Sequence, residues 1–103
     1  MQDTRASVRY AKSLLTLSIE KNVLDEVKAD VDMVCKSFDE SREISNLYLS
    51  PIIPINHKLN ITNKIFKGKV NENTLNLLLN LISRKRDNLI ESILKKFHEL
   101  YNT

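Results

Sequence analysis

The sequence predicts an all-α fold, a six-helix antiparallel bundle formed by residues 1–103 as a single domain. Apolar residues recur with helical spacing along almost the whole chain. The chain contains one glycine and two prolines, too few for the tight turns of a hairpin-rich β fold. The connections between the helical segments are short, and short connections place consecutive helices antiparallel to one another.

The first two helices are bounded by polar capping residues. Either Asp3 or Thr4 is predicted to cap a helix that runs to Lys21. Asn22 is predicted to cap the second helix, whose apolar residues share one arc and face the core. The acidic and basic residues of the second helix, Asp30 among them, are assigned to solvent.

A short third helix and a fourth helix surround an apolar connector. Ser41 starts the third helix, which ends before the proline of 50–51 because the residue before a proline is disfavoured in the α region. Residues 51–55 are expected to be an extended apolar segment that closes one end of the core. The fourth helix is predicted to begin with Asn56 as its cap and to end near residue 66, closed by Gly68.

The last two helices follow the same capping pattern. Asn71 or Asn73 is predicted to cap a fifth helix over residues 74–84. Asp87 is predicted to cap or open a sixth helix that runs to Tyr101. With these two segments, helices account for most of the chain and leave no linker or internal repeat.

The first and fifth helices carry more apolar surface than a single core can cover. On a helical wheel the apolar residues of each span about 200°, whereas packing on one core needs a stripe of about 100° or somewhat more. The apolar residues of the last helix stay within about 140°. If the first and fifth helices are neighbours, their spare edges form one groove or ridge. The chain is therefore interpreted as a binding module.

Amide side chains follow the apolar edge of the fifth helix. Asn73, Asn76 and Asn80 have i, i+3, i+7 spacing and so share one strip of the helix surface. This strip can exchange hydrogen bonds with a docked partner. The alternative interpretation is an ordinary solvated face in an asparagine-rich sequence.

The sequence predicts no catalytic, cofactor or metal site. With Gly68 as the single glycine, the glycine-rich motifs that cradle phosphates are excluded. His57 and His98 have no cysteine or histidine at metal-ligand spacing. Cys35 is assigned to the core of the second helix, and a lone cysteine favours a reducing compartment.

Neither membrane insertion nor nucleic-acid binding is expected. No apolar run approaches the roughly 18–20 residues that span a bilayer, and the start of the chain lacks the order of a signal peptide. The formal charge of +3 permits nucleic-acid binding without requiring it. The basic run 84–86 keeps a small DNA-binding bundle open as an alternative, but the fifth helix has no Arg or Lys before its last turn to read bases.

Several segments together resemble a known family. The run Arg9-Tyr10-Ala11-Lys12-Ser13-Leu14-Leu15 resembles the R-Y-A-K-A-L-F opening of the delta subunit of F-type ATP synthases, whose mitochondrial counterpart is the oligomycin-sensitivity-conferring protein. Further similarities follow in the same order along the chain, at 24–34, 44–51, Lys58, 74–78, Arg86 and 93–100.

The resemblance implies that the chain is the N-terminal domain of a longer protein whose C-terminal stalk-binding domain is absent. It implies a non-catalytic peripheral-stalk, or stator, subunit that holds the N-terminal helix of one α subunit at the top of the catalytic head. The missing domain would join the stalk b subunits. The complex would place the chain peripherally on the cytoplasmic side of the bacterial inner membrane, and the isolated module is expected to be a monomer.

The resemblance also implies which residues contact the α subunit. Tyr10 is the expected anchor, because it combines a large area with a polar tip. A charge at Tyr10 or Leu14 is expected to weaken binding while the bundle stays folded. A stand-alone adaptor that binds another amphipathic peptide through the same groove remains an alternative. The implied contact residues are Tyr10, Ser13, Leu14, Leu17, Asn76, Leu77, Asn80, Leu81 and Arg84.

Overall fold

The computed structural model describes residues 4–103, and these form a bundle of α-helices, which confirms the predicted fold class. No helix in this part of the chain has the length and apolar character needed to cross a membrane. Asp3, one of the two candidate caps, and the start of the chain at 1–3 lie outside the described residues. The elements are α1 (Arg5–Glu20), α2 (Leu24–Glu40), α3 (Arg42–Leu49), α4 (Ile55–Phe66), α5 (Glu72–Ser83), the 3-10 turn η1 (Asp87–Leu89) and α6 (Ile90–Tyr101).

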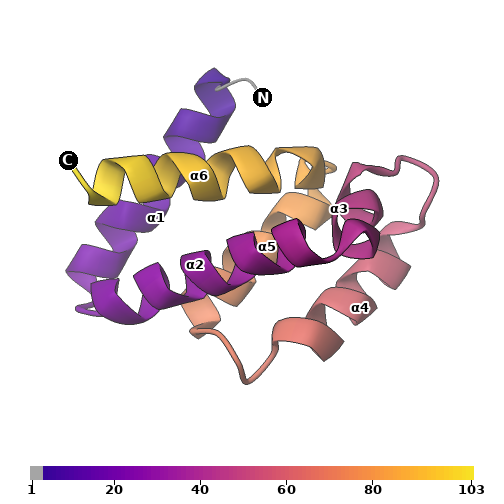
Figure 1. The fold of residues 1–103 in the computed structure, drawn as a ribbon, viewed down its shortest axis with the longest axis horizontal. Helices are drawn as coiled ribbons and strands as arrows, with labels where there is room; N and C mark the ends of the chain where they lie inside the picture. The colour runs from indigo at the N-terminus through magenta and orange to yellow at the C-terminus, as the bar shows by residue number, and fades with distance from the viewer. Residues whose placement is uncertain (1–3) are drawn as a thin grey trace.

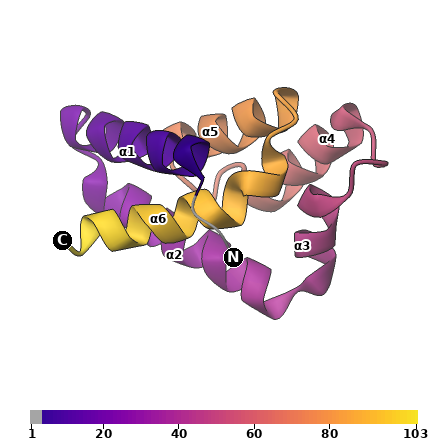
Figure 2. The ribbon, with the colours of Figure 1, turned by 90° about the horizontal axis from the view of Figure 1, so that it is seen from above.

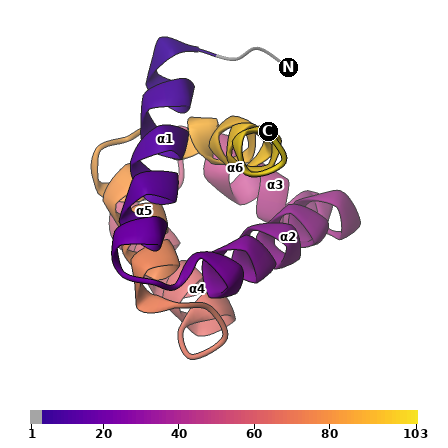
Figure 3. The ribbon, with the colours of Figure 1, turned by 90° about the vertical axis from the view of Figure 1, so that its left-hand side faces the viewer.

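The last helix organises the bundle. α6 packs against both α1 and α2 (Figure 1). α5 packs against α4, and α1 contacts α5 as well as α6 (Figure 2). Seen from its end, the molecule has α1 and α5 side by side on one flank, with α2 on the other (Figure 3). The two helices with surplus apolar surface are therefore neighbours.

Small side chains and branched apolar side chains make the core. Ser7 and Ala11 of α1 are fully buried, and the Ser7 hydroxyl lies 3.0 Å from that of Ser92 on α6. Side chains this small bring the backbones of α1 and α6 close together. Phe97 of α6 is fully buried too, as is Val31 of α2, so the apolar arcs of both helices face inward.

Two of the predicted helix starts are confirmed by side-chain caps. The Thr4 hydroxyl accepts a hydrogen bond from the Ser7 N–H at 3.0 Å, and the Ser41 hydroxyl accepts one from the Ile44 N–H at 3.3 Å. These bonds satisfy amide groups that the helix itself leaves without partners.

The prediction that Asn22 caps α2 is wrong. Asn22 has φ +58° and ends α1: its N–H donates to the Ile19 carbonyl at 3.1 Å, while the Val23 N–H donates to the Ser18 carbonyl at 2.9 Å. This bond pair is the Schellman ending of a helix, and asparagine tolerates the left-handed conformation better than most residues. α2 then begins at Leu24 without a side-chain cap.

The predicted start of α4 at Asn56 is also wrong. Pro54 precedes the helix with φ −61° and ψ 146°, and its carbonyl accepts the N–H of Lys58 at 3.1 Å. Because the ring of proline fixes φ, Pro54 sets the entry to the helix and leaves Asn56 inside its first turn. At the other end of α4, the Lys69 N–H donates to the Phe66 carbonyl at 2.9 Å across a type II turn, with Gly68 at φ +83°.

The connector after α3 closes the core only in part. Ile52 is 87% exposed and Leu49, just before it, is 59% exposed. Ile53 and Ile55 are half-buried and pack against the core near the buried Tyr48, whose hydroxyl lies 2.7 Å from the Thr62 hydroxyl. The segment therefore covers the core with some of its apolar side chains and leaves Ile52 in solvent.

Candidate functional site

A shallow groove of about 250 Å³ lies between α1 and α5. Its floor is apolar, and exposed hydroxyl and amide side chains stand along it. α1 and α5 run in opposite directions here, so residues far apart in the sequence form one surface (Figures 2 and 3). The lining residues are Ser13, Leu14, Leu17, Asn73, Asn76, Leu77 and Asn80.

The groove combines features that suit an amphipathic helix. Leu17 and Leu77 are half-buried, one from each helix, and present apolar area to solvent. Ser13, Asn76 and Asn80 are exposed, so their polar atoms are available to a partner. Apolar side chains of a docked helix can cover the leucines while its polar edge meets the hydroxyl and the amides.

Two residues assigned to the contact surface belong to the core. Leu14 is 3% exposed and Leu81 is 1% exposed. The expectation that the bundle tolerates a charge at Leu14 conflicts with this burial, because α1 turns the position toward the other helices. Leu14 still forms part of the groove floor. Leu81 does not line the groove and packs in the core on the inner face of α5.

Tyr10 and Arg84 lie outside the lining of the groove. Tyr10 is half-buried against the core, one helical turn before Leu14 on the same side of α1. Arg84 is exposed and is the residue that ends α5. Asn73, which the sequence placed on the amide strip but not among the contacts, does line the groove.

A buried carboxylate positions the start of α5. Asp30 is buried, and its Oδ2 accepts hydrogen bonds from the Asn71 N–H at 2.8 Å and the Thr74 hydroxyl at 2.9 Å. The Asn71 side chain then accepts from the Asn73 N–H at 2.9 Å, which makes Asn71 the helix cap. Asp30 thus ties α2 to the amide strip, and its assignment to solvent was wrong. Its position three residues after the buried Val27 was the available signal.

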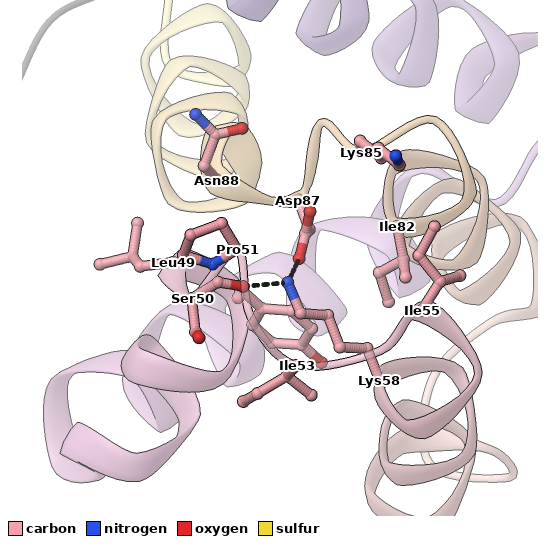
Figure 4. Close-up of a pocket in the computed structure, with 11 residues that line it drawn as sticks. Leu49, Ser50, Pro51, Ile53, Ile55, Lys58, Ile82, Lys85, Asp87 and Asn88 are labelled. Carbon is pink, nitrogen blue, oxygen red and sulfur yellow. Dashed lines mark hydrogen bonds and ion pairs between the residues drawn. The ribbon is translucent and has the colours of Figure 1, made fainter.

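A second cavity, of about 440 Å³, lies where the end of α3, the start of α4 and the turn before α6 meet (Figure 4). An ion pair stands in it. Lys58 Nζ lies 2.6 Å from Asp87 Oδ2 and donates to the Ser50 carbonyl at 2.7 Å. The side chains of Lys58 and Asp87 are 6% and 8% exposed, so both charges are out of water. In the sequence, Lys58 is only a point of family resemblance, and no spacing of residues predicts this pair.

The histidines and the cysteine lie away from both cavities just described. Within residues 4–103, no group of three or more His, Cys, Asp or Glu side chains could hold a metal ion. His98 Nδ1 lies 3.6 Å from Asp32 Oδ1, with both side chains about half exposed. Burial raises the pKa of Cys35 to about 11, which disfavours its nucleophilic thiolate at neutral pH.

Comparison with known proteins identifies the family. The family model described as ATP synthase delta (OSCP) subunit matches residues 6–103. The chain belongs to this family. Family membership confirms the resemblance found in the sequence. Similar relatives include the ATP synthase subunit delta of Cytophaga hutchinsonii, 34% identical over 101 residues, which cover 98% of this chain and 56% of that protein.

Other members of the delta family match over a similar range. The ATP synthase subunit delta of Chlorobium luteolum is 32% identical over 100 residues, 97% of this chain and 55% of that protein. That of Prochlorococcus marinus is 35% identical over 92 residues, 89% of this chain and 51% of that protein. The chain thus spans about half the length of the relatives it matches.

Proposed function

We propose that this chain is a non-catalytic peripheral-stalk subunit of an F-type ATP synthase, and that its α1–α5 groove binds the N-terminal helix of one α subunit. The observation that supports this most directly is an apolar groove built jointly by α1 and α5 in a chain of the delta family. These are the two helices whose sequences carry surplus apolar surface.

The proposed role requires the subunit to tether the catalytic head. Rotation of a central shaft exerts torque on the catalytic head, and ATP synthesis requires that the head does not turn with it. A stator contact must therefore stay bound under load. Burial of an amphipathic helix suits this need, because a standard interface removes roughly 800 Å² per partner from water.

The groove residues have distinct parts in this binding. Leu17 and Leu77 receive the apolar face of the α-subunit helix, on a floor kept rigid by the buried Leu14. Asn76 and Asn80 exchange hydrogen bonds with the polar edge of the bound helix. Such bonds fix its register more than they add affinity, since each replaces a bond to water.

Membership of the family supports a proposal for the remaining contacts of the assembly. A further domain of the complete protein would join the stalk b subunits, and the complex would hold the subunit peripherally on the cytoplasmic side of the membrane. Alone, the domain is expected to be a monomer. Tyr10 extends the contact by one turn of α1, and Arg84 stands near its rim on α5.

Calorimetric titration tests the proposal with a synthetic peptide that carries the α-subunit N-terminal segment of the same organism. Leu17→Asp is expected to weaken binding by about 2 kcal/mol, the loss typical of a central interface residue. Leu77→Asp should have a similar effect from the other helix. Tyr10→Asp measures whether the contact reaches the preceding turn.

Ile19→Asp is the matched control, because it places the same charge on an exposed apolar residue of α1 outside the groove lining. The affinity of this variant should stay unchanged, and circular dichroism should give the same helical signal for all variants. Absence of peptide binding to the unmodified chain, or an equal loss with Ile19→Asp, would contradict the proposed site.

A further inference from the structure

The cavity beside α3 and α4 shares no lining residue with the α1–α5 groove. Its lining mixes polar and apolar side chains, and the apolar ones come from four parts of the chain: the end of α3, the connector after it, the start of α4 and the end of α5. Figure 4 shows these side chains around the Lys58–Asp87 pair. The apolar wall residues are Leu49, Pro51, Ile53, Ile55 and Ile82.

One hydrogen-bond donor in this cavity is unused. An ammonium group carries three N–H donors. Lys58 Nζ has two acceptors among residues 4–103, the Asp87 carboxylate and the Ser50 carbonyl. The lysine is buried and lines the cavity, so its third N–H is within reach of an acceptor that enters the cavity.

The rim of the cavity is basic and lacks ion pairs. Lys85 lines the cavity, and its two neighbours in the sequence are Arg84 and Arg86. All three side chains are exposed. None of them forms a salt bridge within residues 4–103. Asp87, the one carboxylate in the lining, is already paired with Lys58. The positive charge of the rim is therefore not compensated by the fold.

Apolar side chains stand in solvent beside this basic rim. Leu49 is 59% exposed and lines the cavity, and Ile52, three residues on, is 87% exposed. Exposed apolar area next to a cavity can add to the contact with a molecule that enters it. The uncompensated positive charge of the rim then indicates that such a molecule carries negative charge.

We propose that this cavity is a second docking site, which takes a protein segment bearing a bulky apolar side chain flanked by carboxylates. The apolar side chain fills the cavity against Ile53 and Ile82. A carbonyl or carboxylate oxygen of the segment accepts the remaining N–H of Lys58. The flanking carboxylates pair with Lys85 and Arg86 at the rim.

The apolar side chains in the lining favour a peptide over other anionic partners. A phosphate backbone needs rows of exposed cations and makes little use of apolar contacts such as those offered by Ile53 and Ile82. A lipid surface would meet the rim but would leave the cavity and the buried donor unfilled. This proposal does not depend on which helix occupies the α1–α5 groove.

Peptide selection tests the second site. A phage library of random 12-residue peptides is panned against the whole chain and, in parallel, against Lys85→Glu. Peptides enriched on the unmodified chain should share a large apolar residue flanked by Asp or Glu. A fluorescein-labelled consensus peptide should then lose affinity by about tenfold or more with Lys85→Glu, the scale of a lost charge contact at a binding pocket.

Two variants serve as controls. Lys67→Glu makes the same charge change on an exposed lysine after α4, outside the cavity lining, and should change the affinity by less than about twofold. Leu17→Asp damages the groove and should leave the affinity for the consensus peptide unchanged.

Three results would overturn the second site. The first is a consensus without acidic residues, or no enrichment over the Lys85→Glu panning. The second is an affinity that Leu17→Asp abolishes and Lys85→Glu does not. The third is binding of phosphatidylglycerol vesicles or duplex DNA that depends on Lys85 as strongly as the peptide does.

Discussion

At the residue scale, the ion pair of Lys58 and Asp87 buries two charges. Removing two charges from water costs several kcal/mol per ion, and the short distance between them together with the bond to Ser50 offsets that cost. The pair connects the start of α4 to the turn before α6, so it holds together two segments that are distant in the sequence.

Lys58→Met is expected to reduce the free energy of unfolding by about 3 kcal/mol, because it leaves Asp87 buried without a counter-charge. The double variant with Asp87→Asn should recover part of this loss. Urea unfolding followed by circular dichroism measures both. Lys36→Met is the control: Lys36 is 74% exposed and lies 3.9 Å from Glu40, so its loss should cost less than about 1 kcal/mol.

Gly68 offers a test of backbone strain alone. At φ +83° a side chain is disfavoured, yet a Cβ built there would meet nothing within 4 Å. Gly68→Ala should therefore lower the free energy of unfolding by about 1 kcal/mol through the backbone only. Gly68→Asn should cost less, since asparagine tolerates the left-handed region. Equal stability of all three proteins in thermal unfolding would contradict this account.

Cys35 should react slowly with alkylating reagents. Burial raises the pKa of its thiol from 9.0 to about 11, so at pH 8 its thiolate is about 100-fold scarcer than that of an unburied thiol. The rate with iodoacetamide should keep rising tenfold per pH unit beyond pH 9. The chain unfolded in urea is the comparison, and a rate that levels off near pH 9 in the folded chain would contradict the shift.

At the element scale, α5 is the helix that the rest of the fold positions. α4 covers one of its apolar edges, which accounts for part of its surplus apolar arc, and the groove uses the other. Its N-terminal end depends on Asp30 of α2, through the two hydrogen bonds to Asn71 and Thr74. The strip of asparagine side chains on α5 is therefore held in place by a residue of α2.

Asp30→Ala is expected to loosen the start of α5. The Asn71 N–H and the Thr74 hydroxyl would lose their shared acceptor, at a cost of about 2–3 kcal/mol. Hydrogen exchange should show faster exchange of the backbone amides in the first turn of α5, with α6 protected until global unfolding. Asp32→Ala, an exposed position on the same helix, should leave the exchange of α5 unchanged.

Helices were predictable from the sequence because the capping residues act locally. Thr4, Ser41 and Asn71 begin helices through their own side chains. The starts at Asn22 and Asn56 were wrong because asparagine serves left-handed positions and helix interiors as readily as caps. That choice depends on the bonds of neighbouring residues, which periodicity does not reveal.

At the scale of the whole molecule, α1 and α5 are neighbours, which is the condition under which the sequence predicted a groove or ridge, while the burial of individual residues was less predictable. A wheel gives the width of an apolar arc but not which edge meets the core. Leu14 and Leu77 were both expected on the contact surface, and Leu14 is buried. Likewise, Lys58 and Asp87 meet only through packing of distant segments, which no spacing rule anticipates.

Substitutions that introduce a charge should distinguish buried positions from surface positions by their effect on thermal unfolding. Phe97→Asp and Leu14→Asp should both abolish cooperative thermal unfolding, because each buries a charge without a partner. Leu77→Asp should keep a cooperative transition, since its half-buried side chain can turn toward water. A cooperative transition in Leu14→Asp would show that α1 tolerates a charge on its inner face.

One wall of the groove is α1, from the beginning of the chain, and the other is α5, from beyond its middle. Under the proposed function, the partner helix contacts both walls, so its binding surface requires α1 to remain packed on the bundle. α1 has its most extensive contact with α6, so the stability of the α1–α6 contact would limit the load that the proposed stator contact can bear.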